Sequence, residues 1–225
     1  MLESRRGRRK ALLVLTLVAA VVVFVALALL AKPGGPGSLD AQVHAWVGGH
    51  RSQALSTFFT RYTGLGQWFI LAAAAGVAVA ALAASARRRE AAFLLIAMIA
   101  ELLLNLALKN AFARARPPAA QALVHAGGYA FPSGHAMASA TFALALAVIA
   151  WPTRWRVPAA LLAAAFALLM GASRIYLGVH WLTDVLAGWA MAVAVVSGTE
   201  LGLEIHEDAR RPAPQGGGGV GDAAA

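Results

Sequence analysis

Long apolar runs with few charged residues constrain the fold of this chain more than any other feature. The first run covers residues 11–31 and follows a basic segment, residues 1–10. About 20 apolar residues suffice for a helix to cross a bilayer, whereas the apolar core of a signal peptide is roughly 7–15 residues long. We therefore expect an uncleaved first membrane helix that ends at the Pro- and Gly-rich segment 32–37.

Five further apolar runs predict five more membrane helices. They cover residues 67–85, 91–111, 134–151, 157–172 and 181–201. The composition agrees with a membrane protein, since 60% of the residues are hydrophobic and only 13% are charged. A helix satisfies its own backbone hydrogen bonds in lipid. The expected fold class is therefore all-α: a polytopic membrane protein with six transmembrane helices in a bundle.

Two segments lie outside the predicted spans. Residues 38–65 mix aromatic and polar side chains, which predicts an interfacial helical segment after the first span, although an ordered loop packed on the bundle explains the pattern equally well. Residues 206–225 are rich in Gly and Pro, which predicts a disordered C-terminal tail. The membrane domain is therefore expected to cover residues 11–205.

The positive charges lie in short clusters between the apolar runs. Although the formal net charge is +9, this pattern does not form a basic face, so we exclude a nucleic-acid partner. With six spans, 12 of the 19 Lys and Arg residues share a side with the termini and seven lie opposite. The positive-inside rule then predicts a protein of the inner or plasma membrane with cytoplasmic termini. The loops 112–133 and 173–180 would meet at the outer face.

The most polar of the candidate functional clusters covers residues 173–184. His180 and Asp184 are four residues apart, so on a helix they would share one face. A carboxylate there can bind one ring nitrogen and leave the other free as a nucleophile. The guanidinium of Arg174 matches the oxygens of a phosphate. A buried His–Asp pair with an Arg in a loop is the alternative interpretation.

A second cluster lies at the end of the third apolar run. Lys109 and Arg116 are seven residues apart, which is two helical turns, so both can face one anion site. Basic side chains that extend to the membrane interface are the alternative. Glu101 and Asn105 lie on the same stripe as Lys109, and we favour a structural role for both.

The third cluster precedes the fourth apolar run. Ser133 can cap this helix, which would direct free backbone N–H groups, including that of Gly134, towards an anion. His135 in the first turn can donate a proton to a leaving group. A capping serine beside an interfacial histidine is the alternative.

The three clusters together, in this order and with these spacings, resemble the signature motifs of the type 2 phosphatidic acid phosphatase superfamily. Its membrane members also have six spans. The matching segments are Lys109-x6-Arg116-Pro117, Pro132-Ser133-Gly134-His135 and Ser173-Arg174-x5-His180-x3-Asp184.

The resemblance implies a phosphoric or diphosphoric monoester hydrolase that acts on a membrane lipid through a phosphohistidine, without a metal or other cofactor. It implies that His180 is the nucleophile, Asp184 its partner and His135 the proton donor. It also implies a phosphate-binding set: Lys109, Arg116, Ser133, Gly134 and Arg174. Residues 11–205 would then form a membrane phosphatase domain between a basic cytoplasmic N-terminus, residues 1–10, and the tail.

The resemblance leaves the substrate and two residues open. The outward site in a short, Ala-rich chain with more Arg than Lys slightly favours undecaprenyl pyrophosphate over phosphatidic acid or phosphatidylglycerophosphate. Arg114 would contact a second phosphate or a lipid head group, or lie at the surface, and His125 has no expected role.

Two other classes of protein share these motifs or this fold. Vanadate-dependent haloperoxidases resemble the same motifs, but they are soluble, which disagrees with six spans. A catalytically silent lipid-binding or transport protein of the same fold would be marked by loss of His180 or His135, and both are present.

Overall fold

The computed structural model describes residues 2–31 and 36–210, and within these ranges every regular element is helical. The predicted helix stop over residues 32–35 and the predicted tail from residue 211 lie outside the described residues. The elements in chain order are α1 (Leu2–Leu30), α2 (Ser38–Gly49), α3 (Gln53–Tyr62), η1 (Thr63–Gly66), α4 (Trp68–Ala84), α5 (Arg88–Phe112), η2 (Ala119–Gln121), α6 (Gly134–Ala150), α7 (Arg156–Tyr176) and α8 (Leu182–Ala209).

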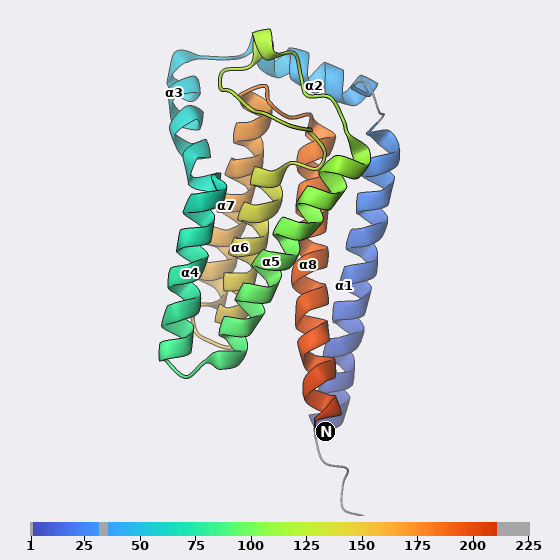
Figure 1. Ribbon diagram of the computed structural model, residues 1–225, viewed down its shortest axis with the longest axis vertical. Coiled ribbons are helices and arrows are strands. Elements are labelled where there is room, and N and C mark those ends of the chain that lie inside the picture. The colour runs from blue at the N-terminus through green and yellow to red at the C-terminus, as the bar shows by residue number, and fades with distance from the viewer. Residues whose placement is uncertain (1, 32–35, 211–225) are drawn as a thin grey trace, which may run out of the picture.

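The helices α1, α4, α5, α6, α7 and α8 run along the long axis of the molecule, and α2 lies across one end of the bundle (Figure 1). α1 packs along α8, while α6 packs against α5, α7 and α8. The face that α6 buries is made largely of small side chains, including Ala136, Ala140, Ala143 and Ala145. Small side chains let neighbouring helices approach closely, which is how membrane helices associate without a hydrophobic driving force between them.

Four helices are long and apolar enough to cross a membrane: α1, α5, α7 and α8. A fifth span results if the α3–η1 segment and α4, which are bent by 51° relative to each other, are taken as one. α6 is apolar but has only 17 residues. Length and composition of the described residues therefore do not confirm the predicted count of six spans.

The helices extend beyond several predicted boundaries. The basic residues up to Lys10 continue α1, because their charges pair with α8: Lys10 and Arg6 bind Asp208. For the same reason residues 206–209, predicted as part of a disordered tail, belong to α8. The predicted segment 38–65 is helical, as α2, α3 and η1.

Candidate active site

His180 lies outside the helices, in the segment 173–180 that was predicted as a loop, so the shared helix face that its spacing with Asp184 would allow does not apply. It lies in the loop between α7 and α8, and Asp184 is in the first turn of α8. The Asp184 carboxylate caps this turn, because its Oδ2 accepts a hydrogen bond from Trp181 N at 2.8 Å. The same oxygen lies 3.4 Å from His180 Nδ1. The pair therefore forms through the cap of a helix N-terminus and not through helical periodicity.

The other ring nitrogen of His180 faces a guanidinium. Arg116 Nη1 lies 3.0 Å from His180 Nε2. A guanidinium can only donate hydrogen bonds, so Nε2 accepts, and the ring proton is assigned to Nδ1, where it faces Asp184. Burial, together with the positive charge of Arg116, holds the pKa of His180 well below its usual range. The imidazole is therefore neutral at pH 7, and its Nε2 lone pair points towards Arg116.

Arg116 reaches this place from a loop. α5 ends at Phe112, and Ala113 adopts a left-handed conformation with φ 43°. The helical spacing from which Lys109 and Arg116 were predicted to face one site is therefore wrong, because the helix ends between them, but both side chains donate to Tyr129 O. The Arg116 guanidinium is held by backbone carbonyl oxygens of Gly127, Gly128, Tyr129 and Val179.

The two other predicted cations come from the last turns of two helices. Lys109 is in the last turn of α5, and its Nζ donates to Tyr129 O at 2.7 Å. Arg174, expected in a loop, lies in the last turn of α7, which continues past the predicted end at residue 172. Its Nη1 donates to Thr63 Oγ1 of η1 at 2.5 Å. Thr63 was not singled out in the sequence, because nothing in its neighbourhood marks it.

The predicted helix start at Ser133 is confirmed. Ser133 is fully buried, and its hydroxyl oxygen accepts a long hydrogen bond, 3.5 Å, from Ala136 N. Its backbone N donates to Asp184 O at 3.0 Å, which fixes the start of α6 to the first turn of α8. Gly134 and His135 then occupy the first turn of α6.

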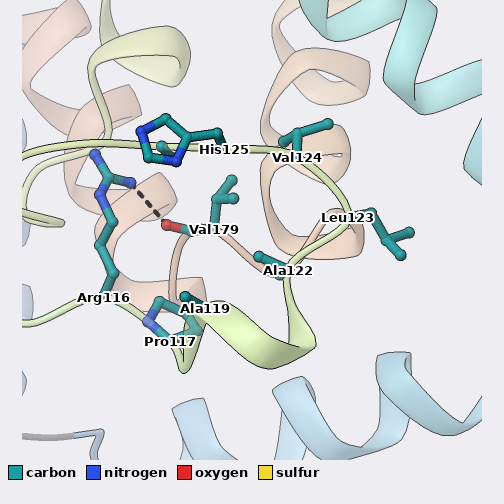
Figure 2. Close-up of a pocket in the computed structure, with 10 residues that line it drawn as sticks. Arg116, Pro117, Ala119, Ala122, Leu123, Val124, His125 and Val179 are labelled. Carbon is teal, nitrogen blue, oxygen red and sulfur yellow. Dashed lines mark hydrogen bonds between the residues drawn. The ribbon is translucent and has the colours of Figure 1, made fainter.

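Two cavities flank these residues. One of about 490 Å³ is bordered by η1, α4, α5, α6 and α7, and its lining includes Glu101, Asn105, Gly134, His135 and Arg174. The other, of about 360 Å³, lies among the loops next to Arg116, with His125 at its edge and Val179 O accepting from the guanidinium (Figure 2). Arg116 therefore stands between the second cavity and His180.

Arg114 is buried and does not lie at the surface or face a head group as predicted. Its side chain is 1% exposed, since the left-handed residue before it turns the chain inward. The guanidinium binds Asp184 from α8 and Asp40 from α2. Asp40 gave no signal in the sequence, because its partner is 74 residues away.

The site lies where four helix ends meet. α6 and α8 contribute their N-termini, which are the positive ends of their helix dipoles, and α5 and α7 contribute C-termini that carry Lys109 and Arg174. Cations in a last turn offset the negative end of a helix. Among the described residues, no three His, Asp or Glu side chains are grouped as metal ligands. The arrangement suits a phosphate group held without a cation of its own.

Fold and site together define an all-helical protein with several apolar helices and a cluster of basic and histidine side chains at one end of the bundle. Residues 90–200 match the family model of the PAP2 superfamily, so this part of the chain is similar to that superfamily. This is the superfamily that the three motifs resemble.

Individual relatives show which PAP2 proteins the chain is similar to. The chain is 35% identical to phosphatidylglycerophosphatase B of Bacillus subtilis over 105 residues, which is 44% of this chain and 51% of that protein. It is 40% identical to undecaprenyl-diphosphatase of Sulfolobus acidocaldarius over 63 residues, 28% of each chain. The aligned segments thus span about half, or less, of these relatives.

A solved structure matches over a longer range. The transmembrane PAP2-type phosphatidylglycerolphosphate phosphatase from Bacillus subtilis superimposes with a TM-score of 0.77 and 26% identity, covering 87% of this chain and 98% of the other. The apolar helices and this membrane relative establish a multi-pass membrane protein.

Proposed function

We propose that this protein is a lipid phosphatase that hydrolyses a phosphate or pyrophosphate through a phosphohistidine. The observation that carries the proposal is the environment of His180. Its Nε2 is unprotonated and faces a guanidinium, while its Nδ1 faces the Asp184 carboxylate. A phosphate oxygen that replaces this contact with Arg116 would bring phosphorus towards Nε2.

The reaction proceeds in two displacements. His180 Nε2 attacks the terminal phosphorus, and the bond from this phosphorus to the leaving oxygen, which belongs to the lipid alcohol or, in a pyrophosphate, to the lipid monophosphate, breaks as His135 donates a proton to that oxygen. Asp184 stabilises the cationic ring that results. His135 then accepts a proton from water, which attacks the phosphohistidine, releases inorganic phosphate and restores His180.

The cations take the place that a metal ion has in many phosphoryl-transfer enzymes. Lys109, Arg116 and Arg174 neutralise the phosphate oxygens, and the Ser133 hydroxyl and Gly134 N–H add hydrogen bonds. All three cations act electrostatically on His180, which supports their placement around one phosphate. We therefore infer a reaction without a metal cofactor.

The orientation in the membrane is part of the proposal. α4 and α6 have 17 residues each, and counting both as spans gives six, with both termini on one side. The distribution of Lys and Arg then favours cytoplasmic termini in the inner or plasma membrane, with the site outward and α2 and α3 at the interface.

Cysteine labelling tests this orientation, because the chain contains no native cysteine. In intact cells, an impermeant maleimide is expected to label Ala120→Cys in η2 and to leave Ser85→Cys after α4 unlabelled until the cells are permeabilised. The reverse pattern would invert the topology.

The substrate class is a membrane lipid, and two substrates stand out. The sequence slightly favours undecaprenyl pyrophosphate, and one relative is named an undecaprenyl-diphosphatase. The relatives that align over longer segments are named for phosphatidylglycerophosphate, which makes this lipid the second candidate. Phosphatidic acid completes the test set.

The deciding experiment is phosphate release by the purified protein in detergent and EDTA, with the three lipids in parallel and His180→Ala as control. Release that persists in EDTA and disappears in the variant is expected. Activity retained by the variant would refute the nucleophile, and no release from any lipid by folded protein would favour a silent lipid-binding protein.

A further inference from the structure

A buried pair of opposite charges lies behind the His180–Asp184 pair. Arg114 and Asp40 are each 1% exposed, and Arg114 Nη2 lies 2.6 Å from Asp40 Oδ2. Isolated charges in such places are strongly unfavourable, so each depends on its partner. The pair joins the loop after α5 to α2, the helix that crosses the end of the bundle (Figure 1).

The pair contacts the carboxylate of Asp184 directly. Arg114 Nη1 lies 2.5 Å from Asp184 Oδ1, whereas Oδ2 is the oxygen that faces Trp181 N and His180. The two oxygens of Asp184 therefore have separate partners, and its carboxylate plane is fixed from both sides. This division leaves Oδ2 available to the histidine ring.

Asp40 holds the other half of the arrangement. Its Oδ1 accepts from Thr183 N at 2.9 Å, and its Oδ2 accepts from Thr183 Oγ1 at 2.7 Å as well as from Arg114. Thr183 precedes Asp184, so Asp40 anchors the first turn of α8 through the backbone. The charge of Arg114 is shared between two carboxylates, which leaves Asp184 more of its negative charge for the cationic ring.

We propose that Asp40 and Arg114 are positioning residues for the nucleophile: they orient Asp184 and divide a single positive charge so that Asp184 supports the phosphorylated, cationic His180. The inference rests on the proposed phosphatase activity. Neither residue borders the two cavities beside the site, so we expect them to act on the rate of the reaction and not on lipid binding.

The variant Asp40→Asn tests the proposal, since it keeps the shape of the side chain and removes its charge. Arg114 would then pair with Asp184 alone. We expect kcat for phosphate release to fall at least about tenfold, as for a misaligned catalytic group, with KM within twofold of the wild type. Asp208→Asn at the opposite end of the bundle is the matched control and should leave kcat unchanged.

A second variant protects the test against misfolding. Thr183→Val is isosteric and removes the hydroxyl that links Asp40 Oδ2 and Arg114 Nη1. If Asp40→Asn does not fold, as judged by gel filtration and unfolding temperature, a lower kcat with unchanged KM in Thr183→Val supports the proposal.

Two outcomes overturn it. One is a kcat within twofold of the wild type in whichever of these variants folds. The other is a loss of activity that only follows the loss of folded protein, which would make the pair structural. Wild-type protein that releases no phosphate from undecaprenyl pyrophosphate, phosphatidylglycerophosphate or phosphatidic acid refutes the proposed function instead, before any variant is compared.

Discussion

At the scale of single residues, the charge state of His180 follows from its surroundings. The ring is 2% exposed and is faced by one carboxylate and several positive or titratable groups. Asp184 and Arg116 lie within hydrogen-bond distance of the ring, and Arg174, Lys109 and His135 act on it electrostatically. Burial disfavours the charged ring most and the positive neighbours add to this effect, so the neutral, nucleophilic form prevails.

The pH dependence of kcat/KM checks this charge state. A lowered pKa means that the neutral ring is present above that pKa and is lost only as the pH falls through it. We therefore expect kcat/KM to show no loss from protonation of His180 at its ordinary pKa of about 6.5. Arg116→Gln removes a neighbouring positive charge, so its acid limb should move to higher pH than in the wild type. An acid limb at the same pH in both proteins would contradict this account.

Contacts between residues that are far apart in the sequence could not be predicted from local sequence patterns. The spacings of Lys109, Ser133, Arg174 and His180 identified the candidate site because each motif is local. Arg114 looked like a surface base, since its two carboxylate partners lie 70 and 74 residues away. Only the folded chain brings these charges together.

At the scale of elements, η1 is packed directly against the site. A Cβ built on Gly66 would lie 2.7 Å from Met170 Sδ and 2.9 Å from His135 Cδ2, whereas one on Gly64 meets nothing within 4 Å. Gly66→Ala should therefore displace His135 and lower kcat roughly 10- to 100-fold. Gly64→Ala in the same segment is the control, and equal kcat values for the two variants would show that the contact with His135 does not matter.

α8 approaches the start of α6 at a glycine. A Cβ on Gly188 would lie 2.9 Å from Ser133 O, which is backbone and cannot move aside easily. We expect Gly188→Ala to destabilise the protein by about 1–3 kcal/mol, measured by unfolding in detergent. Gly198→Ala in the same helix has no contact closer than 3.7 Å and should have little effect. A similar loss of stability in both variants would mean that the effect comes from replacing glycine within α8 and not from the contact with Ser133 O.

Hydropathy predicted the presence of the long helices but not their ends. The predicted end of the fifth run at residue 172 is four residues short of Tyr176, where α7 ends. The missing turn contains Ser173 and Arg174, whose polar groups are buried inside the molecule. A polar residue that faces the interior of a bundle resembles a loop residue when only its hydropathy is read.

At the scale of the whole molecule, one end of the bundle carries the candidate site, and contacts at the other end hold the helices together. Glu200, 2% exposed, lies in the C-terminal half of α8, whose N-terminus is at the candidate site, and binds Arg9 of α1 at 2.5 Å and Arg89 of α5 at 2.9 Å. Through this carboxylate α8 is joined to two helices. The end with the motif residues is held by helix caps, by loop contacts and by the buried pairs of Arg114 with Asp40 and Asp184.

Glu200→Gln tests this division. The variant should lose about 2 kcal/mol of stability, because two charged hydrogen bonds are weakened, and should keep kcat within twofold when folded. Unfolding in detergent and phosphate release measure the two effects separately. Glu207→Gln, in a partly exposed pair with Arg89, should lose less than about 1 kcal/mol. A change in kcat for Glu200→Gln would contradict this division, because it would show that the contacts of Glu200 influence the candidate site.

The end of α5 and the left-handed residue Ala113 that follows it also determine where the chain can tolerate insertions and deletions. In a continuous helix, an insertion of seven residues adds two turns and would keep the residues after it on the same face. The interval from Lys109 to Arg116 is not a continuous helix, because it contains the end of α5 and a left-handed residue. A single insertion or deletion there would displace Arg114 and Arg116 together. Changes in length are therefore best accommodated at residues 118–120, which are exposed and precede the carbonyl groups of residues 127–129 that hold Arg116.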